Sequence, residues 1–249
     1  KEVQHQVKLT TIQRQVAGSP IIQFASKFRE ALDTGKFPVI QSEGKDIIHL
    51  DDLQFQEAVN DHFSDPLNAP NYARIISWSN RRVHQYNNYV RKLHTPSADY
   101  VEGEYLITNE AVMAPDGSRV FKGDSVVLIT SIQPDNQYGI DCWEIILDDH
   151  YRTYQPYEPS HVKDLMKHYA KHKDWKNYFH IKEFFVDLRP YFSSTIAKAQ
   201  GSTYENVLID VADVGRNTKK DEIARLMYTA ITRASGKVYM RGVLPPRLY

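Results

Sequence analysis

Residues 194–201 read STIAKAQG, residues 207–211 read VLIDV and residues 226–234 read LMYTAITRA. The first stretch is a turn of small residues that carries Lys-x-Gln-Gly, the second is an apolar strand, and the third is a helix that ends in Thr-Arg-Ala. A continuous apolar run of this length is typical of a strand buried in a parallel sheet. Together the three stretches predict an α/β fold that handles phosphate groups.

The first part of the chain shows the same alternation of helices and strands. Apolar residues at spacings of three and four predict helices over residues 20–34, 52–63 and 80–93. Residues 7–16 and 73–78 read as strands. Strands that alternate with helices indicate a parallel sheet that is covered on both faces.

A different pattern separates the two α/β segments, which we expect over residues 1–97 and 186–249. Residues 98–159 contain short β runs and predict a small antiparallel β-barrel or sandwich, with Trp143 in its core. Three turn signals divide these runs: PDG at residues 115–117, KGD at residues 122–124 and PDN at residues 134–136. Residues 160–185 follow as a lysine-rich helical connector.

The composition is that of a globular protein without a strong charge bias. Lys+Arg and Asp+Glu are both 31 among the 249 residues, which argues against a histone-like binder but allows a local basic groove. Cys142 is the only cysteine, so no internal disulfide can form and a reducing compartment fits. No apolar run approaches the roughly 18–20 residues of a membrane span, and the first residues lack a signal-peptide core. We therefore expect a cytoplasmic protein that does not contact a membrane.

The stretch at residues 194–201 offers a set of phosphate-binding groups. Ser194 and Thr195 precede a short helical segment, and Lys198 adds a positive charge in its first turn. Taken alone, the two hydroxyl residues fit an ordinary Ser/Thr helix cap better than a phosphate site. Gln200 and Gly201 favour the phosphate interpretation, because glycine permits a left-handed turn and glutamine can reach a nucleotide phosphate or its attacking water.

Two arginines allow two interpretations each. TKKD at residues 218–221 predicts a capping box at the start of the last helix, and Arg233 lies near the end of that helix. There it could simply stabilise the helix dipole, by roughly 0.3–1 kcal/mol. It could also act as an arginine finger that neutralises charge on a γ-phosphate held by another domain. Arg14 allows the same two readings.

The remaining candidates are histidines and tryptophans. His161, His168 and His172 lie on a helix, but no cysteine or clear third ligand accompanies them, so we expect a solvated helix face and no metal. Trp78 and Trp175 could stack on nucleic-acid bases. Trp175 lies among lysines and is the better candidate.

Four stretches of this chain resemble motifs of superfamily-one DNA helicases of the UvrD/Rep class, and most closely of their Dda/RecD-like members. LTTIQR at residues 9–14 resembles the fourth motif, whose arginine contacts the γ-phosphate, and IISWSN at residues 75–80 resembles the strand-to-helix motif that touches DNA. Residues 194–201 with YENV at residues 204–207 resemble the fifth motif, and YTAITRA at residues 228–234 resembles the sixth. The resemblance covers only the C-terminal motor half of such an enzyme.

The resemblance implies a RecA-like second motor domain with the small barrel inserted in it. Arg14, Gln200 and Arg233 would serve catalysis, and Gly201 with the two arginines would contact ATP with Mg2+. The nucleic-acid-binding set comprises Ser77, Asn80, Ser194, Thr195, Lys198 and Trp175. Ala197 stands where the fifth motif usually has His, and Thr203 stands where many relatives have Glu on the ribose. Single-stranded and fork DNA would be the partners, with a possible replication or recombination protein, in the cytoplasm of a bacterial or phage-infected cell.

The phosphate-holding loop of a complete motor is absent from these residues. No G-x-x-x-x-G-K-[ST] occurs, and no Asp-Glu pair follows on a strand. We therefore expect a first, N-terminal RecA-like motor domain to hold most of the ATP, and this span alone to be inactive. A non-catalytic binding module for nucleic acid or a replication protein, and the helicase subunit of a recombination nuclease, stay open as alternatives.

Overall fold

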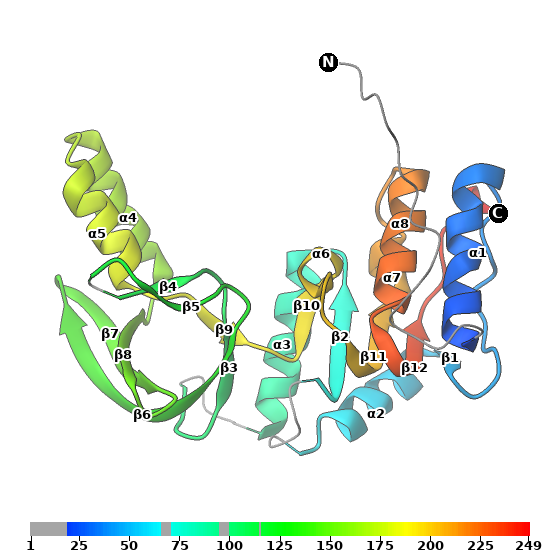
Figure 1. Ribbon diagram of the computed structural model, residues 1–249, viewed down its shortest axis with the longest axis horizontal. Helices are drawn as coiled ribbons and strands as arrows, with labels where there is room; N and C mark the ends of the chain where they lie inside the picture. The colour runs from blue at the N-terminus through cyan, green and yellow to red at the C-terminus, as the bar shows by residue number, and fades with distance from the viewer. Residues whose placement is uncertain (1–18, 66–70, 95–99, 115) are drawn as a thin grey trace. The chain divides into compact units, whose positions relative to one another are not determined.

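The computed structural model describes residues 19–65, 71–94, 100–114 and 116–249. The predicted strand at residues 7–16, and Arg14 with it, lies outside the described residues. The described chain divides into two compact units (Figure 1). Unit 1 contains residues 19–59, 71–83 and 194–249. Unit 2 contains residues 60–65, 84–94, 100–114 and 116–193.

Unit 1 is built on a parallel sheet. Its five strands lie in the order β1 (Ile47–Leu50), β12 (Ala234–Arg241), β11 (Tyr204–Asp210), β2 (Ala73–Ser77) and β10 (Ser193–Thr195). The first four pair in parallel. Leu208 of β11 lies opposite Ile75 on one side and Tyr239 on the other. The apolar run at residues 207–211 therefore supplies a central strand, as predicted.

Helices cover this sheet and bury its apolar side chains. They are α1 (Pro20–Thr34), α2 (Asp52–His62), α6 (Ile196–Ala199), α7 (Val211–Val214) and α8 (Lys220–Ile231), with a short 3-10 helix η1 (Pro246–Leu248) near the end. In α1, Phe24 and Phe28 are fully buried and meet edge to face at 5.6 Å. Gly35 ends α1 with φ 69°, as expected for a left-handed C-cap. α1 and α8 lie side by side (Figure 1).

One helix cap differs from its prediction. The side chain of Thr218 does not cap α8, because the N-cap residue is Lys219 and it makes no side-chain cap hydrogen bond. Asn217 takes that role instead: its Oδ1 accepts from Lys219 N at 2.9 Å, and its Nδ2 donates to Glu222 at 3.0 Å. The hydrogen bonds from Asn217 and then Lys219 lower the pKa of Glu222. The asparagine, one residue earlier, forms the local turn that the capping box would have provided.

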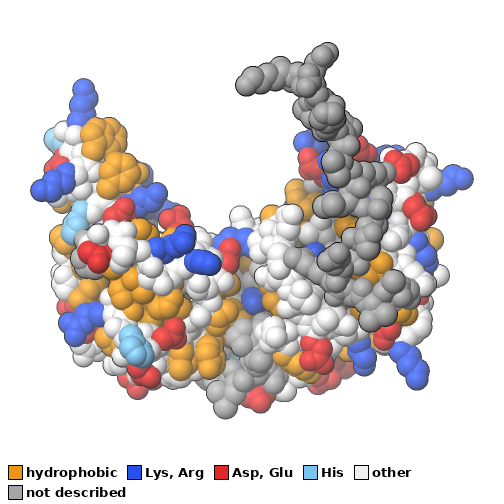
Figure 2. Space-filling model, in the orientation of Figure 1, with side chains coloured by type: hydrophobic (Ala, Val, Ile, Leu, Met, Phe, Trp, Pro, Cys, Tyr) orange, Lys and Arg blue, Asp and Glu red, His pale blue; other side chains and the backbone are white. Residues whose placement is uncertain are grey.

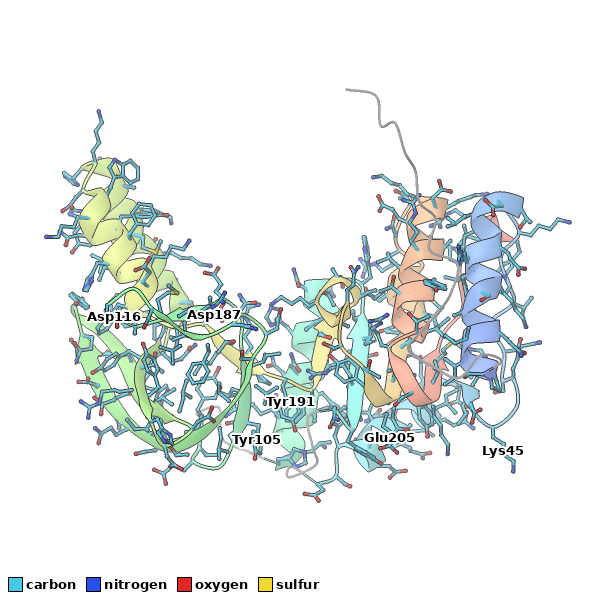
Figure 3. The ribbon with its side chains drawn as sticks, viewed as in Figure 1. Lys45, Tyr105, Asp116, Asp187, Tyr191 and Glu205 are labelled. Atoms are coloured by element: carbon cyan, nitrogen blue, oxygen red, sulfur yellow. The ribbon has the colours of Figure 1, made fainter. Side chains whose placement is uncertain are left out.

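Unit 2 contains an antiparallel sheet. Its strands lie in the order β8 (Tyr151–Pro156), β7 (Ile140–Leu147), β6 (Val126–Gln137), β3 (Tyr105–Thr108) and β9 (Leu188–Pro190), and β4 (Val112–Met113) pairs separately with β5 (Arg119–Phe121). An isolated bridge joins Tyr154 of β8 to Phe185, just before β9. The first strand of this order, β8, therefore approaches the segment that leads into the last strand, β9. Tyr105 of β3 meets Tyr191 edge to face at 6.4 Å (Figure 3).

The hairpin between β6 and β7 corrects a predicted turn. PDN at residues 134–136 lies inside β6, where Pro134 pairs with Trp143. The turn consists of Tyr138 and Gly139, both at positive φ, which is the geometry that a two-residue hairpin prefers. Proline fits here because β6 pairs with β3 only near its start, so its missing N–H costs no ladder hydrogen bond on that side.

The lysine-rich segment forms two helices, α4 (Pro159–Lys171) and α5 (Trp175–Phe184). Their apolar sides pack against β7 and β8 in one cluster, which includes Cys142, Val162 and Ile181. A third long helix, α3 (Asn80–His94), begins in unit 1 and ends in unit 2. Across the described ranges, no helix has both the length and the hydrophobicity to cross a membrane.

Candidate functional site

Arg233 lies at the edge of the parallel sheet where β11 and β12 begin. Tyr204 opens β11 and lies opposite Ala234, which opens β12, and Tyr204 N donates to Arg233 O at 2.9 Å. Figure 3 labels Glu205 at this amino edge. The Arg233 side chain is 7% exposed. Its Nε donates to Thr229 O at 3.0 Å, Nη1 to Ser202 O at 3.1 Å and Nη2 to Thr232 Oγ1 at 3.0 Å.

The turn before β11 contains Gln200 and Gly201. Gln200 is the C-cap residue of α6 and is exposed. Gly201 follows with φ 102°, a backbone conformation that suits glycine, so the predicted left-handed turn is confirmed. Ser202 comes next and accepts the Arg233 hydrogen bond. The fold therefore brings the turn that follows Gln200 into contact with Arg233, although 33 positions separate the two predicted catalytic residues in numbering.

Arg74 adds a second guanidinium near this edge, and the sequence analysis did not select it. It lies in β2 opposite Val207 and is 3% exposed. Its guanidinium carbon lies 4.8 Å from the centre of the Tyr204 ring. The signal in the sequence was a single arginine inside the apolar strand at residues 73–78. A buried arginine is rare unless partners hold it in place.

The opposite, carboxyl edge of the sheet holds the turn between β2 and α3. Asp213 is 2% exposed and accepts hydrogen bonds from Trp78 N at 2.9 Å and from Ser79 N at 2.7 Å. Its other oxygen accepts from Ser79 Oγ at 2.9 Å. Ser79 Oγ in turn accepts from Arg82 N at 3.3 Å and so caps α3. Asp213 therefore fixes the turn that carries Ser77 and Asn80.

A second buried aspartate supports this edge. Asp210, at the end of β11, accepts from Arg82 Nε at 2.8 Å and lies 3.6 Å from Arg241 Nε. Oδ1 of Asp210 also accepts from Asp213 N at 3.1 Å, which caps α7. Asp210 and Asp213 were not selected from the sequence. The sequence signal for Asp210 was its position at the end of an apolar strand.

The predicted nucleic-acid contacts differ in their exposure. Asn80 and Lys198 are exposed, and Thr195 is half-buried with Oγ1 accepting from Lys198 N at 3.3 Å. Thr195 thus caps α6, as the structural interpretation predicted. The hydroxyls of Ser77 and Ser194 are buried, and within the described residues neither has a hydrogen-bond partner. Of these five side chains, Asn80 and Lys198 are therefore the most accessible to a ligand.

Trp175 and the three histidines lie on the α4–α5 hairpin of unit 2. Trp175 opens α5 and is 54% exposed. The rings of His168 and His172 lie 4.4 Å apart, and Nδ1 of His172 makes a hydrogen bond with His168 O at 2.9 Å. Among the residues with described positions, no group of three or more His, Cys, Asp or Glu could hold a metal ion.

The segment that contains Arg233 and the turn before β11 matches a known protein family. Residues 190–240 match the UvrD-like helicase C-terminal domain family. This confirms the resemblance to the C-terminal half of superfamily-one helicases. The matched segment contains α6, β11 and α8, and with them Gln200, Gly201 and Arg233. The helicase-like segment therefore includes the whole contact between the two predicted motifs.

Longer relatives cover more of the chain at low identity. An uncharacterised protein of Acanthamoeba polyphaga mimivirus is 24% identical over 230 residues, which cover 66% of this chain and 46% of that protein. The Pif1 helicase from Candida albicans covers 99% of this chain and 60% of its own, at 12% identity and a TM-score of 0.46. Pif1 helicase from Bacteroides, in complex with ADP-AlF3 and ssDNA, covers 97% and 53%, at 12% identity and a TM-score of 0.46. The chain thus spans about half the length of these proteins, and the identification rests on residues 190–240.

Proposed function

We propose that this chain is the second, RecA-like motor domain of an ATP-dependent DNA helicase. The observation that carries the proposal is the hydrogen bond from Arg233 to Ser202, because it brings the arginine of the sixth motif against the turn of the fifth. Both lie in the segment that matches a helicase domain. The guanidinium of Arg233 and the exposed amide of Gln200, which lies two residues before Ser202, are donors that suit a phosphate group.

In this proposal the amino edge of the sheet completes an ATP site. A first motor domain holds most of the nucleotide with its Mg2+, and hydrolysis of ATP supplies the free energy of movement. Arg233 and Arg14 neutralise charge on the γ-phosphate, while Gln200 orients the attacking water and Gly201 shapes the turn beside it. ATP closes the two motor domains and hydrolysis lets them open, so that the enzyme steps along the strand.

Single-stranded DNA and forks are the proposed nucleic-acid partners. Asn80, Thr195 and Lys198 contact the strand, while Ser77 and Ser194 form the strand ends beneath it. By analogy with Dda-like helicases, the motor moves 5′ to 3′ and unwinds duplex. We further propose that residues 98–159 form a small inserted barrel and residues 160–185 its helical connector, between motor segments 1–97 and 186–249.

A non-catalytic binding module is the second candidate, and one observation favours it. The Arg233 guanidinium already donates to three oxygens of its own chain, among them Thr229 O at the end of α8. Such contacts are what a purely structural arginine at a helix C-terminus would make. A helicase subunit of a recombination nuclease shares the motor chemistry and would differ only in its protein partners.

Reconstitution separates the two candidates. The chain alone, and the same chain joined to its N-terminal motor domain, are compared for ATP hydrolysis with and without single-stranded DNA. We expect no hydrolysis by the chain alone and DNA-stimulated hydrolysis by the two-domain protein. ATP hydrolysis by the chain alone would refute the proposal that a first motor domain holds most of the nucleotide. A two-domain protein that hydrolyses no ATP would favour the binding module.

A further inference from the structure

α5 carries an exposed aromatic face outside the parallel sheet and its edges. Trp175 and Phe179 are 54% and 52% exposed and lie one helical turn apart. Lys182 follows three residues after Phe179, so the three side chains lie on one side of the helix. Tyr178 meets the Trp175 ring at 5.8 Å and the Phe179 ring at 5.2 Å, both edge to face. This contact restrains the two exposed rings.

The core of unit 2 does not account for these rings. α5 is anchored through Ile181, which is 1% exposed and packs with Val162 of α4 and Cys142 of β7. The start of α5 is capped by Asp174, whose carboxylate accepts from Asn177 N at 3.2 Å. The opposite side of the helix is thus fixed by packing and capping, while the aromatic face points into solvent. Two large exposed aromatic rings on one helix face commonly mark a binding surface.

The surroundings of this face are basic. Residues 159–185 contain six lysines and three acidic residues, a balance of +3 in a chain whose total is zero. Asp164 pairs with Lys167 at 2.8 Å, and Asp174 is engaged in the cap. Glu183 is the acidic residue left near the aromatic face. Figure 2 shows apolar side chains beside lysines on this hairpin.

Exposed aromatic rings on a lysine-rich hairpin fit a polyanion that also offers flat apolar surfaces. Unpaired bases stack on aromatic side chains with any sequence, and phosphates pair with lysine. The rise of a helix separates Trp175 and Phe179 by about 6 Å along its axis, so each ring can take its own base. A duplex hides its bases, and it would leave both rings without a partner.

We propose that the α5 face formed by Trp175, Phe179 and Lys182 binds single-stranded nucleic acid, with bases stacked on the rings and a phosphate on the lysine. The choice of nucleic acid as ligand rests on the proposed helicase function. The contact is separate from the sheet edges, so it can fail while the motor assignment holds.

Anisotropy of a fluorescent oligothymidylate, titrated with the whole chain, tests the proposal. The double variant Trp175→Ala/Phe179→Ala is expected to bind at least about tenfold more weakly, because stacking is worth roughly 1–3 kcal/mol per base. Leu53→Ala/Val243→Ala is the matched control, since these exposed apolar side chains lie in unit 1. Lys182→Ala should lower the slope of log affinity against log salt by about one. Glu183→Gln should tighten binding.

Ultraviolet cross-linking to an oligonucleotide that carries iodouracil locates the contact directly. A cross-link in the peptide that contains Trp175 is expected. Double-variant affinity within twofold of the parent, with cross-links elsewhere, would overturn the proposal. The proposal would also be overturned if the double variant bound the oligonucleotide like the parent but lost self-association in sedimentation. The face would then be a protein interface. Circular dichroism checks the fold of each variant. DNA-stimulated ATP hydrolysis by the parent two-domain protein tests the motor assignment separately from this contact.

Discussion

Nη1 of Arg233 donates a hydrogen bond of 3.1 Å to the main-chain oxygen of Ser202. The position of the guanidinium therefore depends on the conformation of the turn before β11, and not only on the end of α8. Gly201 immediately precedes Ser202 and has φ 102°. A change in this turn should consequently reach Arg233 even though the arginine itself is unaltered.

The first prediction concerns Gly201→Ala in the two-domain protein. Nothing lies within 4 Å of the added methyl group, so the cost comes from the backbone alone. We expect the free energy of unfolding to fall by roughly 1–2 kcal/mol, with a drop in DNA-stimulated ATP hydrolysis. Gly103→Ala is the control, because Gly103 has φ 83° and equally open surroundings in unit 2. Equal loss of hydrolysis in both variants would contradict a specific role for the Gly201 turn.

The second prediction concerns the buried carboxylate of Asp213. Asp213→Ala leaves the part-buried donors Trp78 N and Ser79 N without their acceptor, and an unsatisfied donor costs about 1–3 kcal/mol when it is buried. We expect urea unfolding to show a loss of at least about 2 kcal/mol, and weaker binding of single-stranded DNA because the turn before Asn80 loosens. Asp33→Ala, at an exposed position on α1, should change stability by less than about 0.5 kcal/mol. Native stability in the Asp213 variant would disprove the anchoring role.

Much of unit 1 could be predicted because its signals are local. The α1 boundaries follow from Pro20 and Gly35, and the central strand follows from an apolar run that only a buried strand accommodates. The strand β1 was missed, since four residues with a single fully buried member carry almost no pattern. The β6–β7 turn was misplaced because Pro134 is a strong turn signal, whereas Tyr138 at positive φ is an uncommon turn residue.

Residues of the candidate site were predictable only where they belong to a recognisable sequence motif. Gln200, Gly201 and Arg233 could be selected because each follows a recognisable turn or helix end. Asp213, Arg82 and Arg74 could not, because their partners lie more than 120 positions away along the chain. Only the parallel pairing of β11 with β2 brings those partners together.

The third prediction concerns the pH dependence of unit 2. Burial raises the pKa of Tyr100 to about 12, and its hydroxyl donates to Leu188 O at 3.0 Å. The folded state thus holds the proton more tightly than the unfolded state, so the contribution is complete below pH 10 and is lost as the pH rises toward 12. We expect urea unfolding between pH 9 and 11 to show a steeper loss of stability in the parent than in Tyr100→Phe. Parallel curves would contradict the assigned burial.

The central claim is that Arg233 acts on ATP, and one measurement tests it most directly. Steady-state ATP hydrolysis with saturating single-stranded DNA is compared in the two-domain protein, in Arg233→Ala and in Arg225→Ala, whose side chain is exposed on α8, the helix that precedes Arg233. Arginine fingers contribute roughly 10³–10⁵ to turnover, so Arg233→Ala should lose at least about a thousandfold while DNA affinity and circular dichroism stay unchanged. Arg225→Ala should hydrolyse at the parent rate. Parent-like hydrolysis by Arg233→Ala would contradict the claim and leave Arg233 as a structural residue of the helix end.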